Sequence, residues 1–159
     1  MRLGPKQHER VRAVFEAEYP RLTAWCTALA GDPAIGEEIA AEAFSRLLAR
    51  WSQVEQPRGF LYKIAANALN DVWRRQTRRR RMLGLLAVST PVVEPGPDNS
   101  VRDLIARLPE RQRIAVLLHY YAELPLREVA AHMNKPEGTV RRWVAEARLT
   151  LRAQLEDVR

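Results

Sequence analysis

Residues 124–148, LPLREVAAHMNKPEGTVRRWVAEAR, contain two short amphipathic patterns separated by a turn. The first pattern places apolar residues at positions i, i+3, i+4 and i+7 of one helix face: Leu126, Val129, Ala130 and Met133. Pro125 suits the first position of this helix, where a missing N–H is no loss. Asn134 suits the left-handed conformation that a tight turn between two helices requires. The stretch therefore predicts two helices joined by a short turn.

The second helix is expected to begin at Glu137 and to combine an apolar stripe with several arginines. The stripe consists of Val140, Val144, Ala147, Leu151 and Leu155. Arginines project from its other sides: Arg141, Arg142, Arg148 and Arg152. The first turn, Glu137 to Thr139, offers free N–H groups to a phosphate. Such a pair of helices is typical of a DNA-binding helix-turn-helix, and a plain helical hairpin with a solvated basic face is the alternative.

Length and charge point to one or two small domains with a polyanionic partner. The chain has 159 residues, a formal net charge of +7 and a pI near 10.3. Arginine supplies 23 of the 26 positive residues, and its planar fork binds phosphate well, although genome base composition could also produce this bias.

The composition argues against an enzyme, a metal protein and a membrane protein. Cys26 is the only cysteine, which leaves no disulfide framework, and its apolar surroundings predict a buried thiol. The three histidines, His8, His119 and His132, share no ligand spacing. No apolar run approaches the length of a membrane span. We expect a cytoplasmic protein without cofactor, metal, catalytic residues or membrane insertion.

The N-terminal part predicts helices over residues 6–18, from 21 to about 30, and from 34 to 51, with a break at Tyr19–Pro20 and a turn at residues 31–33. The last of these helices has an apolar side: Ile39, Ala43, Phe44, Leu47, Leu48 and Trp51. Its other side carries charged residues: Glu37, Glu38, Glu42 and Arg46. This charged row is either a solvated face or a docking surface for a basic partner.

A long helix is expected from about Arg58 to Arg81. Its buried stripe would contain Leu61, Ile64, Ala65, Ala68 and Val72, and its polar face Asn67, Asp71, Arg74, Arg75 and Arg78. Six of the eight residues at 74–81 are arginine, a density that no packed core accepts. A surface that lies along nucleic acid and a solubilising tail both remain open.

Residues 83–100 have the composition of a linker, although their apolar start at residues 83–88 suggests that this part packs on something. Residues 101–159 then repeat helical apolar patterns, at Val101–Leu108 and at Ile114–Tyr121, before the helix-turn-helix. We therefore predict an all-α chain of two small helical domains, residues 1–82 and 101–159, joined by a flexible linker over 83–100.

Three stretches resemble the extracytoplasmic-function class of bacterial sigma factors. GDPAIGEEIAAEAFSRLLARW (31–51) is similar to that class's helix for binding core RNA polymerase, and PRGFLYKIAANALNDVWRRQ (57–76) to its helix for the promoter minus-ten element. LPERQRIAVLLHYYAELPLREVAAHMNKPEGTV (108–140) resembles its reader of the minus-thirty-five element. The resemblance implies a transcription initiation factor that contacts double-stranded promoter DNA and the melted minus-ten strand. It also implies an anti-sigma factor as a partner.

The resemblance further implies roles for single residues. Core polymerase would be bound by Glu37, Glu38, Glu42 and Arg46. The minus-ten element would be bound by Gln53, Arg58, Lys63, Asn67, Asp71, Arg74, Arg75 and Arg78, with a flipped base captured by the 52–58 loop. The minus-thirty-five element would be bound by Arg127, Thr139, Arg141, Arg142 and Arg148.

The sequence departs from the family pattern at Ala41, at the caps Pro125 and Pro136, at Asn134, and at Trp143 and Glu146 in the recognition helix. Packing is the simple interpretation of Trp143. We expect Glu146 to weaken the minus-thirty-five preference; an unchanged promoter affinity of Glu146→Arg would count against this. The rival hypotheses are a stand-alone helix-turn-helix regulator and an RNA-binding or nuclease-like basic protein.

Overall fold

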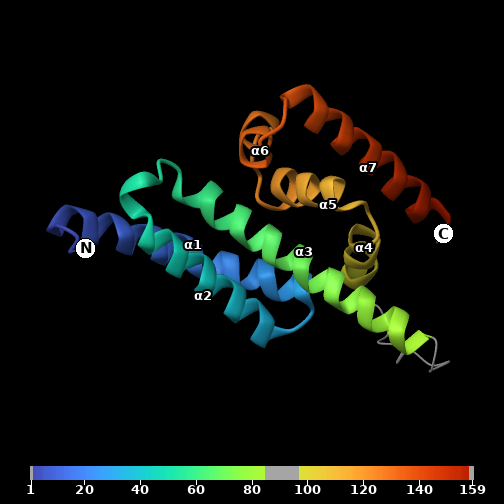
Figure 1. The fold of residues 1–159 in the computed structure, drawn as a ribbon, viewed down its shortest axis with the longest axis horizontal. Helices are drawn as coiled ribbons and strands as arrows, with labels where there is room; N and C mark the ends of the chain where they lie inside the picture. The colour runs from blue at the N-terminus through green and yellow to red at the C-terminus, as the bar shows by residue number, and fades with distance from the viewer. Residues whose placement is uncertain (1, 85–96, 158–159) are drawn as a thin grey trace. The chain divides into compact units, whose positions relative to one another are not determined.

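The computed structural model describes residues 2–84 and 97–157, and every regular element within these ranges is a helix (Figure 1). This confirms the predicted all-α fold class. The helices are α1 (Pro5–Ala30), α2 (Pro33–Ala49), the 3-10 turn η1 (Trp51–Gln53), α3 (Pro57–Gly84), α4 (Pro97–Ala106), α5 (Glu110–Val116), the π-helical turn η2 (Leu117–Tyr121), α6 (Leu126–Met133) and α7 (Glu137–Asp157).

Packing divides the chain into two compact units, residues 1–69 and 70–159. The second unit therefore includes the C-terminal half of α3. Most of the expected linker, including Leu85, Leu86 and Val88, lies outside the described residues. Helix α3 runs to Gly84 rather than Arg81, and α4 begins at Pro97 rather than Val101, since a proline fits the first turn of a helix. The predicted domain boundaries at residues 82 and 100 stay a prediction.

The expected helix break at Tyr19–Pro20 is wrong, because α1 is one continuous helix with Pro20 inside it. A proline within a helix leaves the carbonyl four residues earlier without its N–H partner. Here that residue is Glu16, and both Glu16 and Pro20 are exposed, so water can satisfy the carbonyl. Tyr19 also stacks on Phe15 with ring centroids 4.7 Å apart, which holds the two turns together.

The predicted turn at residues 31–33 is confirmed. Gly31 has a φ of 75°, and its N–H donates to the carbonyl of Thr27. The side chain of Asp32 accepts from the N–H of Ala34 at 2.9 Å and so caps α2. This short connection lays α2 alongside α1 (Figure 1). At their crossing Gly36 meets the backbone of Thr27, which leaves no space for a side chain.

The core of the first unit is formed by apolar residues of α1, α2, η1 and the first half of α3: Leu22, Cys26, Leu29, Ile39, Ala43, Phe44, Leu47, Trp51, Leu61 and Ala65. The predicted burial of Cys26 is confirmed. Leu48, expected in the same stripe, is instead 49% exposed.

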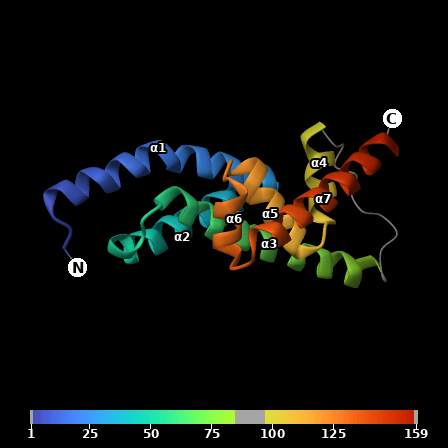
Figure 2. The same cartoon turned by 90° about the horizontal axis from the view of Figure 1, so that it is seen from above.

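In the second unit, α5, α6 and α7 pack together, and Figure 2 views these helices from above. Their core contains Leu108, Val116, Leu117, Leu118, Val129, Val140, Val144 and Ala147. Tyr121 was expected on the buried face but is 36% exposed. The reason is η2, in which the N–H of Ala122 donates to the carbonyl of Leu117 five residues earlier. This wider turn shifts the apolar stripe out of α-helical register.

Candidate nucleic-acid interface

The turn between α6 and α7 has the geometry that the sequence predicts. Asn134 ends α6 with φ 55° and ψ 48°, which confirms the expected left-handed residue. The next residue, Lys135, donates its N–H to the carbonyl of Ala130 at 3.0 Å and closes the helix end. Pro125 differs slightly from the expectation, because it caps α6 from outside and Leu126 is the first helical residue. The turn brings the arginine-rich α7 directly after α6.

One side of α7 is fixed in the core of the second unit. Val140, Val144 and Ala147 are buried, as the stripe predicts, whereas Leu155 at its far end is exposed. Trp143 is only 7% exposed, which confirms the packing interpretation of this residue. The guanidinium of Arg111 also lies 5.6 Å from the centre of its ring. With this side buried, the other sides of α7 face solvent.

The residues predicted to contact the minus-thirty-five element are exposed or half-exposed: Arg127, Thr139, Arg141, Arg142 and Arg148. Two of the arginines lie near carboxylates one turn away. Nη2 of Arg141 is 2.9 Å from Oε1 of Glu137, and Nε of Arg142 is 3.8 Å from Oε1 of Glu146. Exposed ion pairs of this kind contribute little free energy. A phosphate or a base edge can therefore replace these carboxylates.

Glu146 has a structural role that the sequence did not indicate. Its Oε2 accepts a hydrogen bond of 3.0 Å from Nε2 of Gln112, which lies 34 residues earlier on α5. Gln112 is only 8% exposed and therefore needs a hydrogen-bond partner. Glu146 thus joins α7 to α5. Its expected effect on promoter preference stays a prediction.

The predicted minus-ten residues on α3 occupy successive turns of the helix: Lys63, Asn67, Asp71, the adjacent Arg74 and Arg75, and Arg78. Lys63 is half-buried and the others are exposed. Oδ1 of Asp71 lies 3.6 Å from Nη1 of Arg74. Asp71 and Arg74 thus lie within ion-pair distance of each other on the exposed side of α3.

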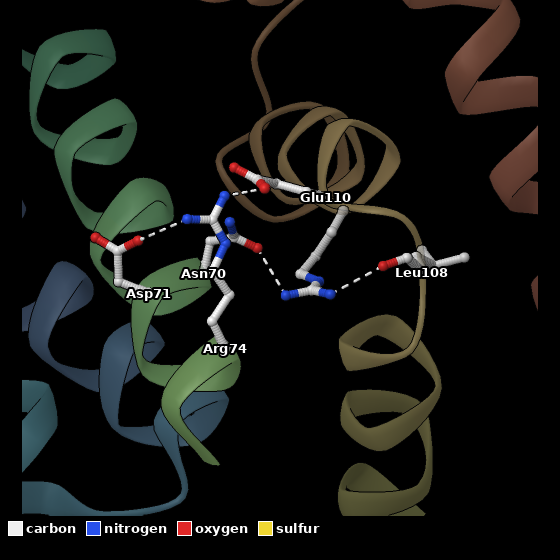
Figure 3. Close-up of polar contacts among 6 residues, drawn as sticks. Asn70, Asp71, Arg74, Leu108 and Glu110 are labelled. Carbon is white, nitrogen blue, oxygen red and sulfur yellow. Dashed lines mark hydrogen bonds and ion pairs between the residues drawn. The ribbon is translucent and has the colours of Figure 1, made fainter. Parts of the chain in front are cut away.

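Beside this row, Asn70 of α3 contacts Arg113 of α5, a contact that the sequence did not predict (Figure 3). Nη1 of Arg113 donates to Oδ1 of Asn70 at 2.7 Å, and Nη2 donates to the carbonyl of Leu108 at 2.9 Å. The guanidinium lies 5.3 Å from the centre of the Trp73 ring. Burial, and secondarily the nearby charge of Arg74, lower the pKa of Arg113.

Two further predicted minus-ten residues lie at the start of α3 and just before it. Gln53 is exposed at the end of η1. Arg58 is half-buried, with its Nε 3.9 Å from Oε1 of Glu18 and its guanidinium 5.7 Å from the centre of the Tyr62 ring. Burial, and to a lesser extent Glu18, raise the pKa of Tyr62. Arg58 thus helps to join α1 to α3, and its contact with DNA stays a prediction.

The charged side of α2 is exposed along its length: Glu37, Glu38, Glu42 and Arg46. Nε of Arg46 donates to Oε1 of Glu42 at 2.8 Å, so one of the three carboxylates is already paired within the helix. The opposite side of α2 is buried against its neighbours. The structure thus presents these residues as a surface, which is what either interpretation of the row requires.

Within residues 2–84 and 97–157, no group of three histidine, cysteine or acidic side chains could hold a metal ion. Burial raises the pKa of the Cys26 thiol to about 12, so this group stays protonated near neutral pH. None of the helices described is both long and apolar enough to cross a membrane.

Two family models match the chain. Residues 14–79 match the model described as sigma-70 region 2, and residues 98–151 match the model described as sigma-70, region 4. The first region contains α2 and the polar row of α3, and the second contains the helix-turn-helix. Two such regions in one chain do not favour a stand-alone helix-turn-helix regulator.

Curated relatives agree with these matches. The chain is 29% identical to the ECF RNA polymerase sigma factor SigW of Bacillus subtilis, over 84% of this chain and 82% of that protein. It is 28% identical to the probable ECF sigma factor SigI of Mycobacterium tuberculosis, over 89% and 54%. It is 29% identical to the probable sigma factor RfaY of Xanthomonas campestris, over 84% and 37%, so the chain spans about a third to a half of the last two relatives.

A solved structure has the same fold. The sigma factor RpoE of Bartonella quintana, crystallised with the anti-sigma factor NepR, superposes with a TM-score of 0.67 at 18% identity. The match covers 93% of this chain and 98% of that one. Together with the two region matches and the named relatives, this shows that the chain belongs to the sigma-70 family of RNA polymerase sigma factors, and within it to the extracytoplasmic-function class.

Proposed function

We propose that this sigma factor binds core RNA polymerase in the cytoplasm, directs it to a two-part promoter, and has no catalytic chemistry of its own. The observation that carries the proposal is the exposed pair Arg141 and Arg142 in the first turns of α7, held outward by the buried stripe behind them. Arginines at the start of a recognition helix are placed to reach base edges in the major groove.

The helix-turn-helix would read the minus-thirty-five element. Thr139, Arg141 and Arg142 enter the major groove, and Arg127 and Arg148 bind phosphates on either side. The exposure of the four arginines supports this assignment. Phosphate contacts position a protein on the duplex, whereas contacts to base edges select the sequence.

The polar row of α3 would bind the minus-ten element. Asn67, Arg74 and Arg75 hold the edge of the duplex, and Asp71 orients the guanidinium of Arg74, a role that their 3.6 Å separation supports. The remaining basic and amide side chains of this region contact the same element: Gln53, Arg58, Lys63 and Arg78. The 52–58 loop captures a base extruded from the melted strand, which offsets the cost of unstacking it.

The charged side of α2 would dock on a basic surface of the polymerase. Glu37 and Glu38 carry exposed carboxylates, and the ion pair between Glu42 and Arg46 continues the row one turn further on. We also infer an anti-sigma partner that covers these exposed surfaces. The structural relative that was crystallised with NepR supports this inference by analogy.

The decisive test is transcription in vitro with purified core polymerase on fragmented genomic DNA, with start sites mapped. We expect starts that depend on this factor and a complex with core polymerase that survives gel filtration. Neutralising the row with Glu37→Gln and Glu38→Gln should weaken that complex. A stand-alone regulator would bind DNA without the polymerase and would not co-purify with it. An absence of factor-dependent starts together with an absence of core binding would refute the proposal.

The recognition helix is tested on the promoters so found. Arg141→Ala with Arg142→Ala should abolish the preference for the minus-thirty-five sequence. The double variant should also have a shallower slope in a plot of log binding constant against log salt concentration. The slope should change by about 0.9 for each phosphate that the variant no longer binds. Arg152→Ala, on the same helix but outside the predicted set, is the matched control and should retain the sequence preference.

A further inference from the structure

Arg74 on the proposed minus-ten face already has two acidic partners. One is Asp71 on the same helix, and the other is Glu110 at the start of α5, whose Oε2 forms an ion pair with Nη2 of Arg74 (Figure 3). Both α5 and this part of α3 belong to the second compact unit. A carboxylate of α5 therefore already pairs with a guanidinium to which we assign DNA binding.

Arg113 anchors α5 in this position. Its guanidinium donates to Asn70 at 2.7 Å and to the carbonyl of Leu108 at 2.9 Å, and it lies on the face of Trp73. Asn70 is 2% exposed, so this is a part-buried contact and not a surface ion pair. Hydrogen bonds from charged donors in such places stabilise more than exposed pairs do. The anchor thus keeps Glu110, one turn before Arg113, within reach of Arg74.

Glu110 presents to Arg74 what a DNA phosphate would present, namely negatively charged oxygen atoms that accept from the guanidinium. Since a single Nη2 cannot donate to both in the same geometry, a phosphate that binds Arg74 in this orientation must displace Glu110. Asp71 need not leave, because it contacts the other terminal nitrogen, Nη1. The two carboxylates therefore have different roles, in that Asp71 orients the arginine and Glu110 competes for it.

We propose that Glu110 is an internal competitor for the DNA-binding side chain of Arg74, so that α5 must leave α3 before the minus-ten strand can bind at full strength. This inference rests on the proposed function of the α3 face. In the free factor, the contact between Glu110 and Arg74 weakens the binding of single-stranded DNA. Binding becomes stronger when α5 moves away from α3.

The test is the affinity of the full chain for a short fluorescein-labelled single strand of mixed sequence, measured by anisotropy at low salt. Glu110→Gln should bind it about two- to fivefold more tightly than the unchanged chain, as expected for loss of an exposed ion pair. Glu156→Gln on α7 is the matched control, since it changes the net charge equally without touching Arg74. Its affinity should change less than that of Glu110→Gln.

The same comparison in a chain that carries Arg74→Gln separates competition for Arg74 from a general effect of net charge on DNA binding. In the presence of Arg74→Gln, the gain from Glu110→Gln should disappear, because the arginine for which Glu110 competes is gone. A gain of equal size in both backgrounds, or no gain in either, would overturn the inference. If Arg74→Gln leaves affinity unchanged even in a chain that carries Glu110→Gln, where the arginine is no longer occupied, the proposed DNA-binding role of Arg74 fails, and the inference fails with it. If Arg74→Gln weakens binding while Glu110→Gln has no effect, only the inference fails.

The anchor offers an independent measurement. Arg113→Lys keeps the charge but loses the two-pronged donation to Asn70 and Leu108. We expect faster amide hydrogen exchange in α5 and tighter binding of the same labelled strand. Faster exchange without tighter binding would contradict competition at Arg74.

Discussion

Gly36 lies where α2 crosses α1, and replacing it with alanine should destabilise the first unit. An added Cβ would lie 2.3 Å from Oγ1 of Thr27, 2.6 Å from its backbone N and 2.7 Å from its Cα. Rotation of the threonine side chain could relieve only the first of these contacts. The other two require one helix to move away by several tenths of an ångström, against a core that contains Leu22 and Cys26.

The expected change in the free energy of unfolding is the difference between two opposing effects. Overpacking a close-packed core costs about 1–3 kcal/mol, and a clash with backbone belongs at the upper end of this range. Alanine recovers about 1 kcal/mol through its higher helix propensity. We therefore expect Gly36→Ala to lower the free energy of unfolding by about 2 kcal/mol, which corresponds to a fall of about 1 M in the urea midpoint.

Urea unfolding followed by tryptophan fluorescence measures this change, and hydrogen exchange assigns it to α1 and α2. The matched control is Gly138→Ala, because a Cβ at Gly138 meets no atom within 4 Å. That variant should be as stable as the unchanged protein or up to about 1 kcal/mol more stable. A Gly36→Ala chain with an unchanged or higher midpoint would refute the close-crossing argument.

Three further predictions concern the turn, the α5–α7 contact and the buried thiol. Asn134→Ala should cost about 1–2 kcal/mol in urea unfolding, because its φ of 55° strains alanine, whereas Asn134→Gly should stay close to the unchanged protein; equal losses would contradict this. Glu146→Ala should lower the free energy of unfolding by about 1 kcal/mol, because Gln112 loses its acceptor. In thermal unfolding, the double variant with Gln112→Ala should lose less stability than the sum of the two single variants, and strict additivity would argue against the contact. The folded Cys26 thiol ionises only near pH 12 while the unfolded thiol ionises near 9, so the unfolded state binds fewer protons between these values and stability falls as pH rises through this window. Cys26→Ala should therefore show a shallower decline of the urea midpoint above pH 9, and an identical decline would contradict the buried thiol.

Local chemistry explains why some features could be predicted from sequence. The left-handed Asn134 and the turn at residues 31–33 depend on backbone preferences of single residues, and both are found as predicted. The burial of Val140 and Val144 follows from spacing alone. Features of this kind involve residues within one or two helical turns of each other.

Features that depend on distant partners were missed. Asn70 looks like a surface residue in the sequence, but its acceptor oxygen is bound by Arg113, 43 positions later. Pro20 was expected to break α1, and only its exposure, together with that of Glu16, explains why the helix continues. Spacing rules describe one helix at a time and cannot include the environment that another helix provides.

The π-helical turn Leu117–Tyr121 constrains how the length of this chain can change during evolution. Relative to an α-helix such a turn contains about one additional residue, and one residue corresponds to about 100° of rotation. Removal of a single residue here would restore α-helical register and rotate the helices that follow, including the proposed recognition helix α7, around the axis of α5. Homologous chains should therefore differ in residue identity along this segment far more readily than in its length.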